Sequence, residues 1–344
     1  MQALLEKLIK EGIEQNIFPA AVAAVGVKNK TLAMYASGHI YLPNGPSTDE
    51  HTLFDMASCS KIMSTTMLSL LALEQGDITL EDSISRFFEV PLDKENITVR
   101  NLLTHTSGIA PHLLLQNLTS DPKNVFDVIL SLPLAGERGK PMYSCLGFIL
   151  LGKILEKVYQ KPLDVLSKEK VFRPLNMLNS GYLPKGDNIA ATELDPLTGK
   201  AIQGVVHDEN ARFMGGVAGN AGVFSNIKDM DIFAHMLAQD GQGLLSPISM
   251  LNARRNYTQG FDEHRGLGFH VGGLAGSFFG DLLPYDSFGH TGFTGTSVVV
   301  DPNSGFYCVL LTNRVHPSRE NVKHLRFRRK IHNVMYAEFY KNRA

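Results

Sequence analysis

The chain has 344 residues, 44% of them apolar, and its 33 lysines and arginines nearly balance 34 aspartates and glutamates, giving a net charge of −1. This length and composition predict a globular protein with a substantial core, arranged as one large domain or two moderate ones. The neutral balance gives no electrostatic reason to expect a nucleic-acid partner. We interpret one basic cluster near the C-terminus as the solvated face of a terminal helix: Lys323, Arg326, Arg328, Arg329 and Lys330.

The number of cysteines and the lengths of the apolar runs help to predict the cellular compartment. Three cysteines, Cys59, Cys145 and Cys308, cannot form a disulfide framework, and an odd count is typical of a reducing compartment. The sequence has no apolar run of 18 residues that could span a membrane, and residues 1–18 have the pattern of an acidic amphipathic helix rather than of a signal peptide. We therefore expect a cytoplasmic protein, although an exported protein trimmed of its signal would have the same sequence.

The chain begins with three predicted elements. Residues 1–17 have the apolar spacing of a helix. Residues 20–40 contain two apolar runs on either side of Lys28–Lys30, which predict a hairpin of two strands. A loop rich in proline and glycine follows at 43–46. Two strands are therefore expected ahead of the segment that carries the first motif.

Residues 52–77 are the segment around which the chain is organised. They include a predicted helix with apolar side chains on more than one face, at Ile62, Met63, Met67, Leu68, Leu70, Leu71 and Leu73. This pattern indicates a helix that is buried on most sides, and Gly76 is expected to end it. Ser58 lies at or just before the first turn, and Lys61 follows three residues later, so its amine can approach the Ser58 hydroxyl.

The Ser58–Lys61 pair suits acyl transfer. A serine hydroxyl becomes nucleophilic when a nearby base takes its proton, and a desolvated lysine with a lowered pKa can be that base. A helix N-terminus can also stabilise the oxyanion on the attacked carbonyl. The S-x-x-K spacing recurs at Ser120, Ser167 and Ser225, which we interpret as a turn, an exposed helix face and a helix N-cap. The spacing alone therefore leaves open that Ser58 is an ordinary N-cap.

The rest of the chain predicts helices in the middle and strands near the end. Helical periodicity is clearest at 78–88, 98–108, 125–132, 146–160 and 228–241. Strands are expected at 266–273, 287–292, 295–302 and 305–314, with a last helix at 321–340. This order predicts a discontinuous sheet domain at residues 1–57 and 230–344, a mostly helical domain at 58–229, and an active site at their seam.

A second candidate site residue, Tyr143, lies just ahead of the helix expected at 146–160. A phenol beside a cation can shuttle a proton to and from a leaving group. The alternative is a tyrosine at a helix entry that Ser144 caps. On the residues alone, both interpretations stay open.

A third candidate is the His-Thr-Gly-Phe run at 290–293. A glycine there lets a substrate backbone lie close to the strand edge, and Thr291 offers a hydroxyl to a carboxylate. The N–H of Phe293 can complete an oxyanion hole. Taken alone, the same residues also describe a glycine-rich hairpin.

Other conspicuous patterns do not indicate a bound cofactor. The glycine-rich run at 215–225 lacks the phosphate-binding patterns and is interpreted as a close-packed loop that can wall a pocket. The sequence contains no HExxH, paired CxxC or EF-hand pattern, and we interpret His207–Glu209 as a polar loop rather than a metal site. We therefore expect neither a metal nor an organic cofactor.

Together, Ser58–Lys61, Tyr143 and His290–Gly292 resemble the three motifs of the serine β-lactamase and penicillin-binding-protein superfamily. Their order and spacing are similar to its class C β-lactamase and low-molecular-weight D,D-peptidase and esterase branch. Further segments that resemble this branch are 102–109, 148–158, 207–225 and 289–297. The resemblance spans nearly the whole chain. It implies an α/β (α+β) fold whose antiparallel sheet is flanked by the N- and C-terminal helices, plus a mostly helical domain.

The resemblance implies a role for each motif. Ser58 would attack a carbonyl carbon to form an acyl-enzyme, and Lys61 and Tyr143 would manage its proton. The N–H groups of Ser58 and Phe293 would hold the oxyanion. His290 would stand where efficient class C β-lactamases have a lysine, a pattern similar to D,D-peptidases, D-aminopeptidases and family esterases. Strong β-lactam hydrolysis is therefore not expected.

The sequence departs from the family pattern at two positions. The second motif usually ends in an amide or an acid but here ends in Cys145, whose thiol is a weak donor, so the contact to a substrate acylamide is in doubt. Asn220 stands where related proteins often have histidine. Thr291 and Gly292 match the family's substrate-binding strand.

The resemblance thus implies a serine hydrolase of small-molecule, peptide or ester substrates that needs no cofactor. We expect a D-amino-acid peptidase or carboxypeptidase with weak β-lactamase activity, and the first alternative is a carboxylesterase of the same family. A second alternative is a low-turnover ligand-binding or sensing module, which Cys145 would explain. A third is that Cys145 or Cys59 is itself the nucleophile or a redox switch. The oligomeric state is left open.

Overall fold

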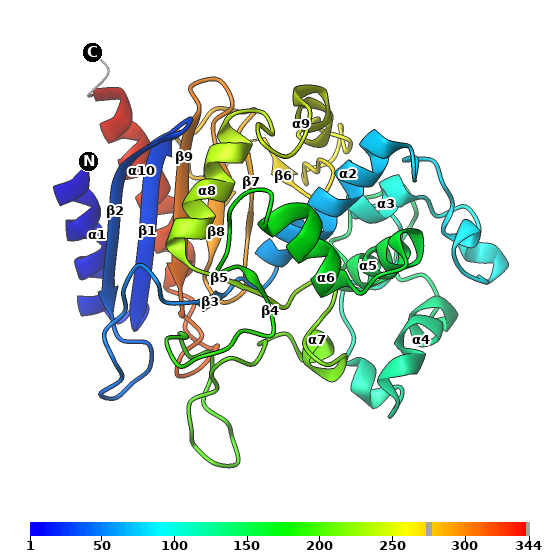
Figure 1. The fold of residues 1–344 in the computed structure, drawn as a ribbon, viewed down its shortest axis with the longest axis horizontal. Coiled ribbons are helices and arrows are strands. Elements are labelled where there is room, and N and C mark those ends of the chain that lie inside the picture. The colour runs from blue at the N-terminus through cyan, green and yellow to red at the C-terminus, as the bar shows by residue number, and fades with distance from the viewer. Residues whose placement is uncertain (273–276, 342–344) are drawn as a thin grey trace.

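The computed structural model describes residues 1–272 and 277–341. Its central feature is an antiparallel sheet of six strands in the order β2-β1-β9-β8-β7-β6. These strands are β1 (Ala20–Val27), β2 (Lys30–Gly38), β6 (His270–Val271), β7 (Phe288–Thr291), β8 (Ser297–Val300) and β9 (Phe306–Thr312). Strands from the two ends of the chain are neighbours, because β1 pairs with β9 (Figure 1).

Helices cover both faces of this sheet. α1 (Gln2–Glu14) and α10 (His324–Lys341) pack on one face, and α8 (Ile227–Ala238) packs on the other (Figure 1). Odd-numbered residues of β1 from Ala21 to Val25 share a core with α1 and α10, while the even-numbered ones share a core with α8. Burial on both faces explains why this strand is apolar throughout instead of alternating.

A mostly helical region lies beside the sheet, on the side of β6 and β7 (Figure 1). Its helices are α2 (Met67–Gln75), α3 (Val99–Leu103), α4 (Val125–Ser131), α5 (Cys145–Tyr159), α6 (Leu163–Ser167), α7 (Glu209–Phe213) and α9 (Pro247–Ala253). Three short strands form a second sheet in the order β3 (Phe54–Asp55), β5 (Val223–Ser225) and β4 (Gly181–Tyr182). This small sheet connects the segment before Ser58 with the glycine-rich run.

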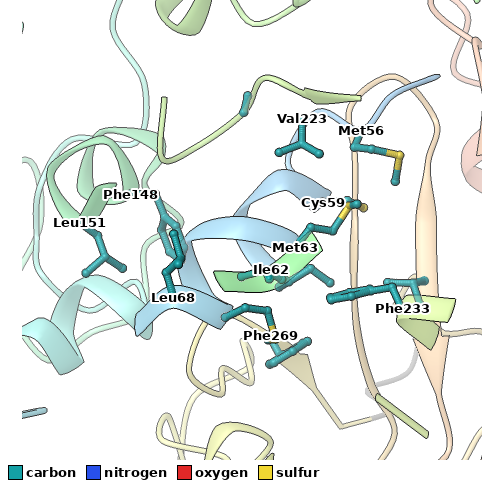
Figure 2. Packing of buried hydrophobic residues seen from close by; sticks show 14 of the residues in the cluster. Met56, Cys59, Ile62, Met63, Leu68, Phe148, Leu151, Val223, Phe233 and Phe269 are labelled. Atoms are coloured by element: carbon teal, nitrogen blue, oxygen red, sulfur yellow. The ribbon is translucent and has the colours of Figure 1, made fainter. Parts of the chain in front are cut away.

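The buried helix after Ser58 joins the two regions. It begins as a π-helix over Lys61–Thr66, continues as α2, and ends at Gly76, whose φ of 76° is left-handed. Figure 2 shows that it passes between Phe148 and Leu151 of α5 on one side and Phe233 of α8 on the other. Packing on several sides accounts for apolar residues on more than one of its faces.

The predicted antiparallel sheet with flanking terminal helices and a helical region is confirmed. The helix predicted at 78–88 is wrong, because the described structure there has only a single 3₁₀ turn, Ile84–Arg86. Ser83 caps this turn, and the N–H of Ile84 donates to the carbonyl of Ile97, so the backbone bonds outside any helix.

Two of the serines in S-x-x-K patterns also differ from expectation. Ser167 is buried rather than exposed, and its Oγ lies 2.6 Å from Ser64 Oγ. Ser225 belongs to β5, and the neighbouring Asn226 caps α8 instead by accepting from the N–H of Asp229. Neither of these two serines touches the candidate active site described below.

Some sequence predictions are not tested, or are tested only in part, by the described residues. The strand predicted at 266–273 includes Gly273, which lies outside the described residues, and β6 forms within the remainder. The domain division at residues 1–57 and 230–344 against 58–229 stays a prediction. Within residues 1–272 and 277–341, no helix has the length and apolar character needed to cross a membrane.

Candidate active site

Ser58 lies at the turn between β3 and the buried helix. The preceding Ala57 has a φ of 46°, a left-handed conformation that its N–H stabilises by donating to Asp55 Oδ1 at 2.8 Å. The N–H of Met56 donates to the carbonyl of Val223, which ties this turn to the second sheet. Left-handed backbone at a non-glycine residue is commonly retained at functional sites. The turn exposes Ser58 to two adjacent cavities.

Lys61 lies beneath Ser58 and is fully buried. Its Nζ donates to Ser58 Oγ at 3.0 Å and to the carbonyl oxygen of Asn220 at 3.0 Å, and it lies 3.5 Å from Cys145 Sγ. The Nζ is also 5.0 Å from the centroid of the Tyr143 ring. The amine is therefore directed at the hydroxyl by contacts with two other segments of the chain, at residues 143–145 and at Asn220.

The protonation of Lys61 differs from the sequence-based expectation of a lowered pKa. Burial alone lowers the pKa of the ammonium, but the neighbouring Cys145 and Tyr143 groups raise it by more, and the pKa lies above its usual value of 10.5. Burial raises the pKa of the Tyr143 phenol, against the opposing effect of Lys61. In the resting site at neutral pH, both groups therefore hold their protons.

Tyr143 and Cys145 are positioned by the start of α5. Ser144 is the N-cap, and its Oγ accepts from the N–H of Gly147 at 3.0 Å, as expected in one of the two interpretations of this segment. The N–H of Ser144 donates to Nδ1 of the buried His105 at 3.0 Å. Cys145 is the first residue of the helix, so its thiol is brought next to Lys61 while the tyrosine ring faces the cavities.

His290 and Thr291 end β7, which lies between β8 and the edge strand β6. Burial, followed by the charges of Lys61 and Arg265, lowers the pKa of His290 well below its usual 6.5, so the imidazole is neutral at pH 7. Its Nδ1 donates to the carbonyl of Thr291 at 2.8 Å, which leaves the lone pair on Nε2. The histidine therefore adds no positive charge where a lysine would.

Gly292 is required where β7 passes the nucleophile turn. A Cβ at this position would lie 2.5 Å from the carbonyl oxygen of Met56 and 2.1 Å from Thr296 Oγ1. The next residue, Phe293, is half exposed, and its ring lies 4.3 Å from the guanidinium of Arg314 and 5.5 Å from the His207 ring. Gly292 thus lets the backbone pass close to Met56, and the next residue supplies an aromatic ring that contacts Arg314 and His207.

Two cavities meet at Ser58. The larger, of about 480 Å³, is called the arginine cavity, and the residues that line it are Ser58, Tyr143, Arg265, His270, His290, Thr291, Gly292, Phe293, Arg314, Arg319, Val322, His324, Leu325 and Arg328. The smaller, of about 340 Å³, is called the Cys145 cavity, and the residues that line it are Ala57, Ser58, Pro111, His112, Tyr143, Cys145, His207, Asp208, Glu209, Ala221, Phe293 and Arg319. Ser58, Tyr143, Phe293 and Arg319 belong to both, so these residues form the boundary.

The structure brings all eight of the predicted site residues together. Seven of them line one or both cavities, namely Ser58, Tyr143, Cys145, His290, Thr291, Gly292 and Phe293. The eighth, Lys61, lies below the surface in hydrogen-bond contact with Ser58. The glycine-rich run also contributes, because Ala221 lines the Cys145 cavity and Asn220 accepts from Lys61.

None of the four arginines of the larger cavity was predicted from the sequence as a site residue. The expectation that Arg328 lies on a solvated face is wrong, because this side chain is only 4% exposed and its Nη2 donates to the carbonyl of Gly292 at 3.3 Å. A usable signal existed, since Arg328 has the helical spacing of the buried Phe327 and Ile331. Arg265, Arg314 and Arg319 carried no comparable pattern.

Ion pairs hold two of these arginines. Arg319 binds the carboxylates of Glu193 and Glu209 at 2.6 and 2.8 Å. Arg265 pairs with Glu263, and its Nη1 lies 2.8 Å from His270 Nε2. These contacts fix guanidinium groups at two sides of the arginine cavity. In the part of the chain that the structure describes, no cluster of three His, Cys, Asp or Glu side chains could hold a metal ion.

Comparisons with known proteins identify the family of this chain. A family model described as Beta-lactamase matches residues 5–333. The "Putative D-alanyl-D-alanine carboxypeptidase" of Escherichia coli K12 is 32% identical over 305 residues, which cover 77% of this chain and 70% of that protein. The N-acetylmuramyl-L-alanine amidase of Bacillus subtilis 168 is 28% identical over 359 residues, which cover 90% of this chain and 80% of that protein.

The fold is likewise similar to solved structures. Simvastatin synthase, LovD, from Aspergillus terreus matches with a TM-score of 0.77 at 17% identity over 98% of each chain. The family predicted from the three motifs is thereby confirmed, since its model matches nearly the whole sequence. This chain belongs to the beta-lactamase family and is a serine hydrolase of the penicillin-binding-protein and β-lactamase type.

Proposed function

We propose that this hydrolase releases a leaving group with a free carboxylate from a peptide, through an acyl-enzyme on Ser58. The observation that carries the proposal is the 3.0 Å contact between Lys61 Nζ and Ser58 Oγ at the junction of the two cavities. A nucleophile hydrogen-bonded to a candidate base is the arrangement expected for covalent catalysis. The name of the Escherichia coli relative, a carboxypeptidase, supports the same reaction class.

The reaction begins with proton transfer. The Ser58 Oγ attacks the carbonyl carbon while its proton passes to the Lys61–Tyr143 pair, which must first have lost one proton to the solvent. The backbone N–H groups of Ser58 and Phe293 stabilise the oxyanion. The pair then returns the proton to the leaving nitrogen as the carbon–nitrogen bond breaks. Water attacks the resulting ester, and the pair again carries the proton, so Ser58 regains its hydroxyl.

The arginine cavity supports a leaving group with a carboxylate. The residues that line it include four arginines, and no aspartate or glutamate is among the described lining residues. A carboxypeptidase must accommodate the terminal carboxylate of the residue that it removes, and guanidinium groups bind carboxylates with charge-assisted hydrogen bonds. The acyl part of the substrate would then occupy the Cys145 cavity.

Hydrolysis of N-acetyl-D-alanyl-D-alanine tests this function. We expect release of D-alanine by the wild type and no release above background by Ser58→Ala. Ser60→Ala is the matched control, because this neighbouring serine is buried and accepts from the N–H of Val223 without lining either cavity. Equal turnover by wild type and Ser58→Ala would exclude the proposed nucleophile.

Cys145 favours a carboxylesterase as the second candidate. Its thiol contacts Lys61 at 3.5 Å and is a weak donor, so the Cys145 cavity offers less to a substrate amide than a side-chain amide would. Comparing p-nitrophenyl acetate with the peptide distinguishes the two functions. Efficient ester hydrolysis without peptide hydrolysis would favour the esterase, and a stable adduct without product release would favour a sensing module. Cys145→Asn is expected to raise peptide turnover relative to ester turnover.

We also propose a cytoplasmic location. The three cysteines are free, and Cys145 lies beside Lys61, so its oxidation would alter the site. A reducing compartment keeps such a thiol intact. Fractionation of the native cells with an antibody to this chain checks the location, and recovery outside the cytoplasm would contradict it.

A further inference from the structure

The four guanidinium groups of the arginine cavity differ in whether a carboxylate pairs with their positive charge. Arg265 pairs with Glu263, and Arg319 pairs with Glu193 and Glu209. Arg314 and Arg328 form no ion pair with a described carboxylate. They instead donate to backbone carbonyls, Arg314 Nε to Phe293 at 2.8 Å and Arg328 Nη2 to Gly292 at 3.3 Å. Two guanidinium groups in this cavity therefore have no described carboxylate in direct contact, although the charge of Glu193, which binds Arg319, also acts on Arg314.

These two arginines lie close to the place where the reaction is proposed. The carbonyls that they hold belong to consecutive residues, directly after Thr291 at the end of β7. Arg328 is almost fully buried, and its Nε has no hydrogen-bond partner among the described residues. Burial lowers the pKa of Arg328 to about 10, and the charge of Arg314 acts in the same direction. Both groups are still charged at pH 7, and they repel each other.

The histidines of the cavity do not change this charge. Burial, followed by the charge of Arg265, lowers the pKa of His270 well below 6.5. Burial also lowers the pKa of His324 to about 3, with the charges of Arg328 and Arg314 acting in the same direction. The excess at neutral pH is therefore carried by guanidinium groups.

A single carboxylate that binds one of these guanidinium groups through two hydrogen bonds leaves the other without a direct anionic contact. Buried charges are costly unless a partner compensates them, and a pair of neighbouring like charges adds to that cost. A cavity of about 480 Å³ has room for a second anionic group beside the first. The two guanidinium groups without a carboxylate in direct contact therefore favour a ligand with two negative charges.

We propose that the arginine cavity selects a leaving group with two carboxylates, so that the preferred substrate ends in an acidic residue such as D-glutamate. This inference rests on the proposed function for the position of the leaving group. It goes beyond that function because a terminal carboxylate is common to every carboxypeptidase substrate. The second carboxylate belongs to the side chain and is assigned to the Arg314 and Arg328 guanidinium groups.

Two nearly isosteric substrates test this selectivity. N-acetyl-D-alanyl-D-glutamate and N-acetyl-D-alanyl-D-glutamine share the terminal carboxylate and differ in one side-chain charge. We expect kcat/KM for the glutamate peptide to exceed that for the glutamine peptide by roughly 10-fold. Equal values, or a preference for glutamine, would overturn the inference while leaving the proposed carboxypeptidase function intact.

A variant and its control locate the selectivity. Arg328→Gln is expected to bring the ratio of the two kcat/KM values close to one, mainly by slowing the glutamate peptide. Arg326→Gln removes the same charge from an exposed position on α10 that does not line the cavity, so the ratio should persist. An unchanged ratio in Arg328→Gln would overturn the assignment of the second carboxylate to this pair of arginines.

A binding measurement separates this inference from the chemistry. Calorimetry with Ser58→Ala compares D-glutamate with D-glutamine, and we expect roughly 10-fold tighter binding of D-glutamate. This result would stand even if the wild type hydrolysed no peptide, in which case the proposed function alone would fail. Equal binding of the two amino acids together with equal peptide kinetics would overturn the inference.

Discussion

The two cavities that meet at Ser58 differ in charge although they share four boundary residues. The arginine cavity has four guanidinium groups and no carboxylate among its described lining residues. The Cys145 cavity has Asp208 and Glu209, together with a thiol and an apolar wall. We therefore expect the nucleophile to act on every substrate, while each cavity recognises a different part of the substrate. Changes to the shared residues should therefore slow all substrates, and changes in one cavity should alter selectivity.

The largest effect is expected from replacing Lys61, because it contacts the nucleophile that both cavities share. Lys61→Met keeps the buried volume but removes the amine that contacts Ser58 Oγ, so kcat should fall roughly 10⁴-fold with peptide and ester substrates alike. Lys94→Met is the control, because Lys94 is also buried but pairs with Asp93 away from both cavities. A loss confined to one substrate class would show that Lys61 acts on that substrate rather than on Ser58.

A change in the substrate tests whether the arginine cavity recognises the terminal carboxylate. Replacing the terminal carboxylate of N-acetyl-D-alanyl-D-alanine by a carboxamide removes the partner of the guanidinium groups. We expect kcat/KM to fall roughly 100-fold, because a carboxamide forms no charge-assisted hydrogen bond with the guanidinium groups. Hydrolysis of p-nitrophenyl acetate, which has no carboxylate, gives the reference rate. Similar kcat/KM values for the acid and the amide would show that the cavity does not recognise the terminal charge.

The pH dependence reports on the shared proton pair. The reactive form has lost one proton, and the pKa of Lys61 is raised by Cys145 and Tyr143 against the effect of burial. The deprotonated fraction at pH 7 is therefore small and grows with pH. With an uncharged ester, kcat/KM should rise about 10-fold per pH unit from pH 6 to pH 9. A rate that is constant above pH 7 would contradict the raised pKa.

The smallest effect is expected from the wall between the cavities. Phe293→Ala keeps the backbone N–H but removes the ring that lies between Arg314 and His207. The ratio of kcat/KM for bulky N-benzoyl peptides to kcat/KM for N-acetyl peptides should rise by roughly 3- to 10-fold. Phe293→Leu retains most of the bulk and should give an intermediate ratio. An unchanged ratio in both variants would mean that the ring does not limit the size of the substrate.

The motif residues could be predicted because their chemistry depends on short spacings within single elements. Ser58 and Lys61 are one helical turn apart on a segment whose apolar pattern predicts burial. The positions of Tyr143 and His290 came from the family resemblance, since sequence separation alone does not bring their ring centroids within 6.2 Å of each other. The glycine at 292 is explained only by the backbone that passes it.

The charge of the site could not be predicted because it is assembled from distant segments. Arg314 follows β9 and Arg328 lies on α10, and they meet through the carbonyls of Gly292 and Phe293. Arg328 also sits among exposed cations, so composition predicts exposure while the helical period predicts burial. The raised pKa of Lys61 likewise depends on Cys145, which reaches it only in the folded chain.

The central claim is that Ser58 is the group that becomes acylated. Incubation with a fluorescent penicillin and with a p-nitrophenyl ester, followed by intact mass measurement and peptide mapping, tests it most directly. We predict one adduct per chain on Ser58, present in the wild type and Ser60→Ala and absent from Ser58→Ala. An adduct on Cys145, or no adduct from either probe, would contradict the account.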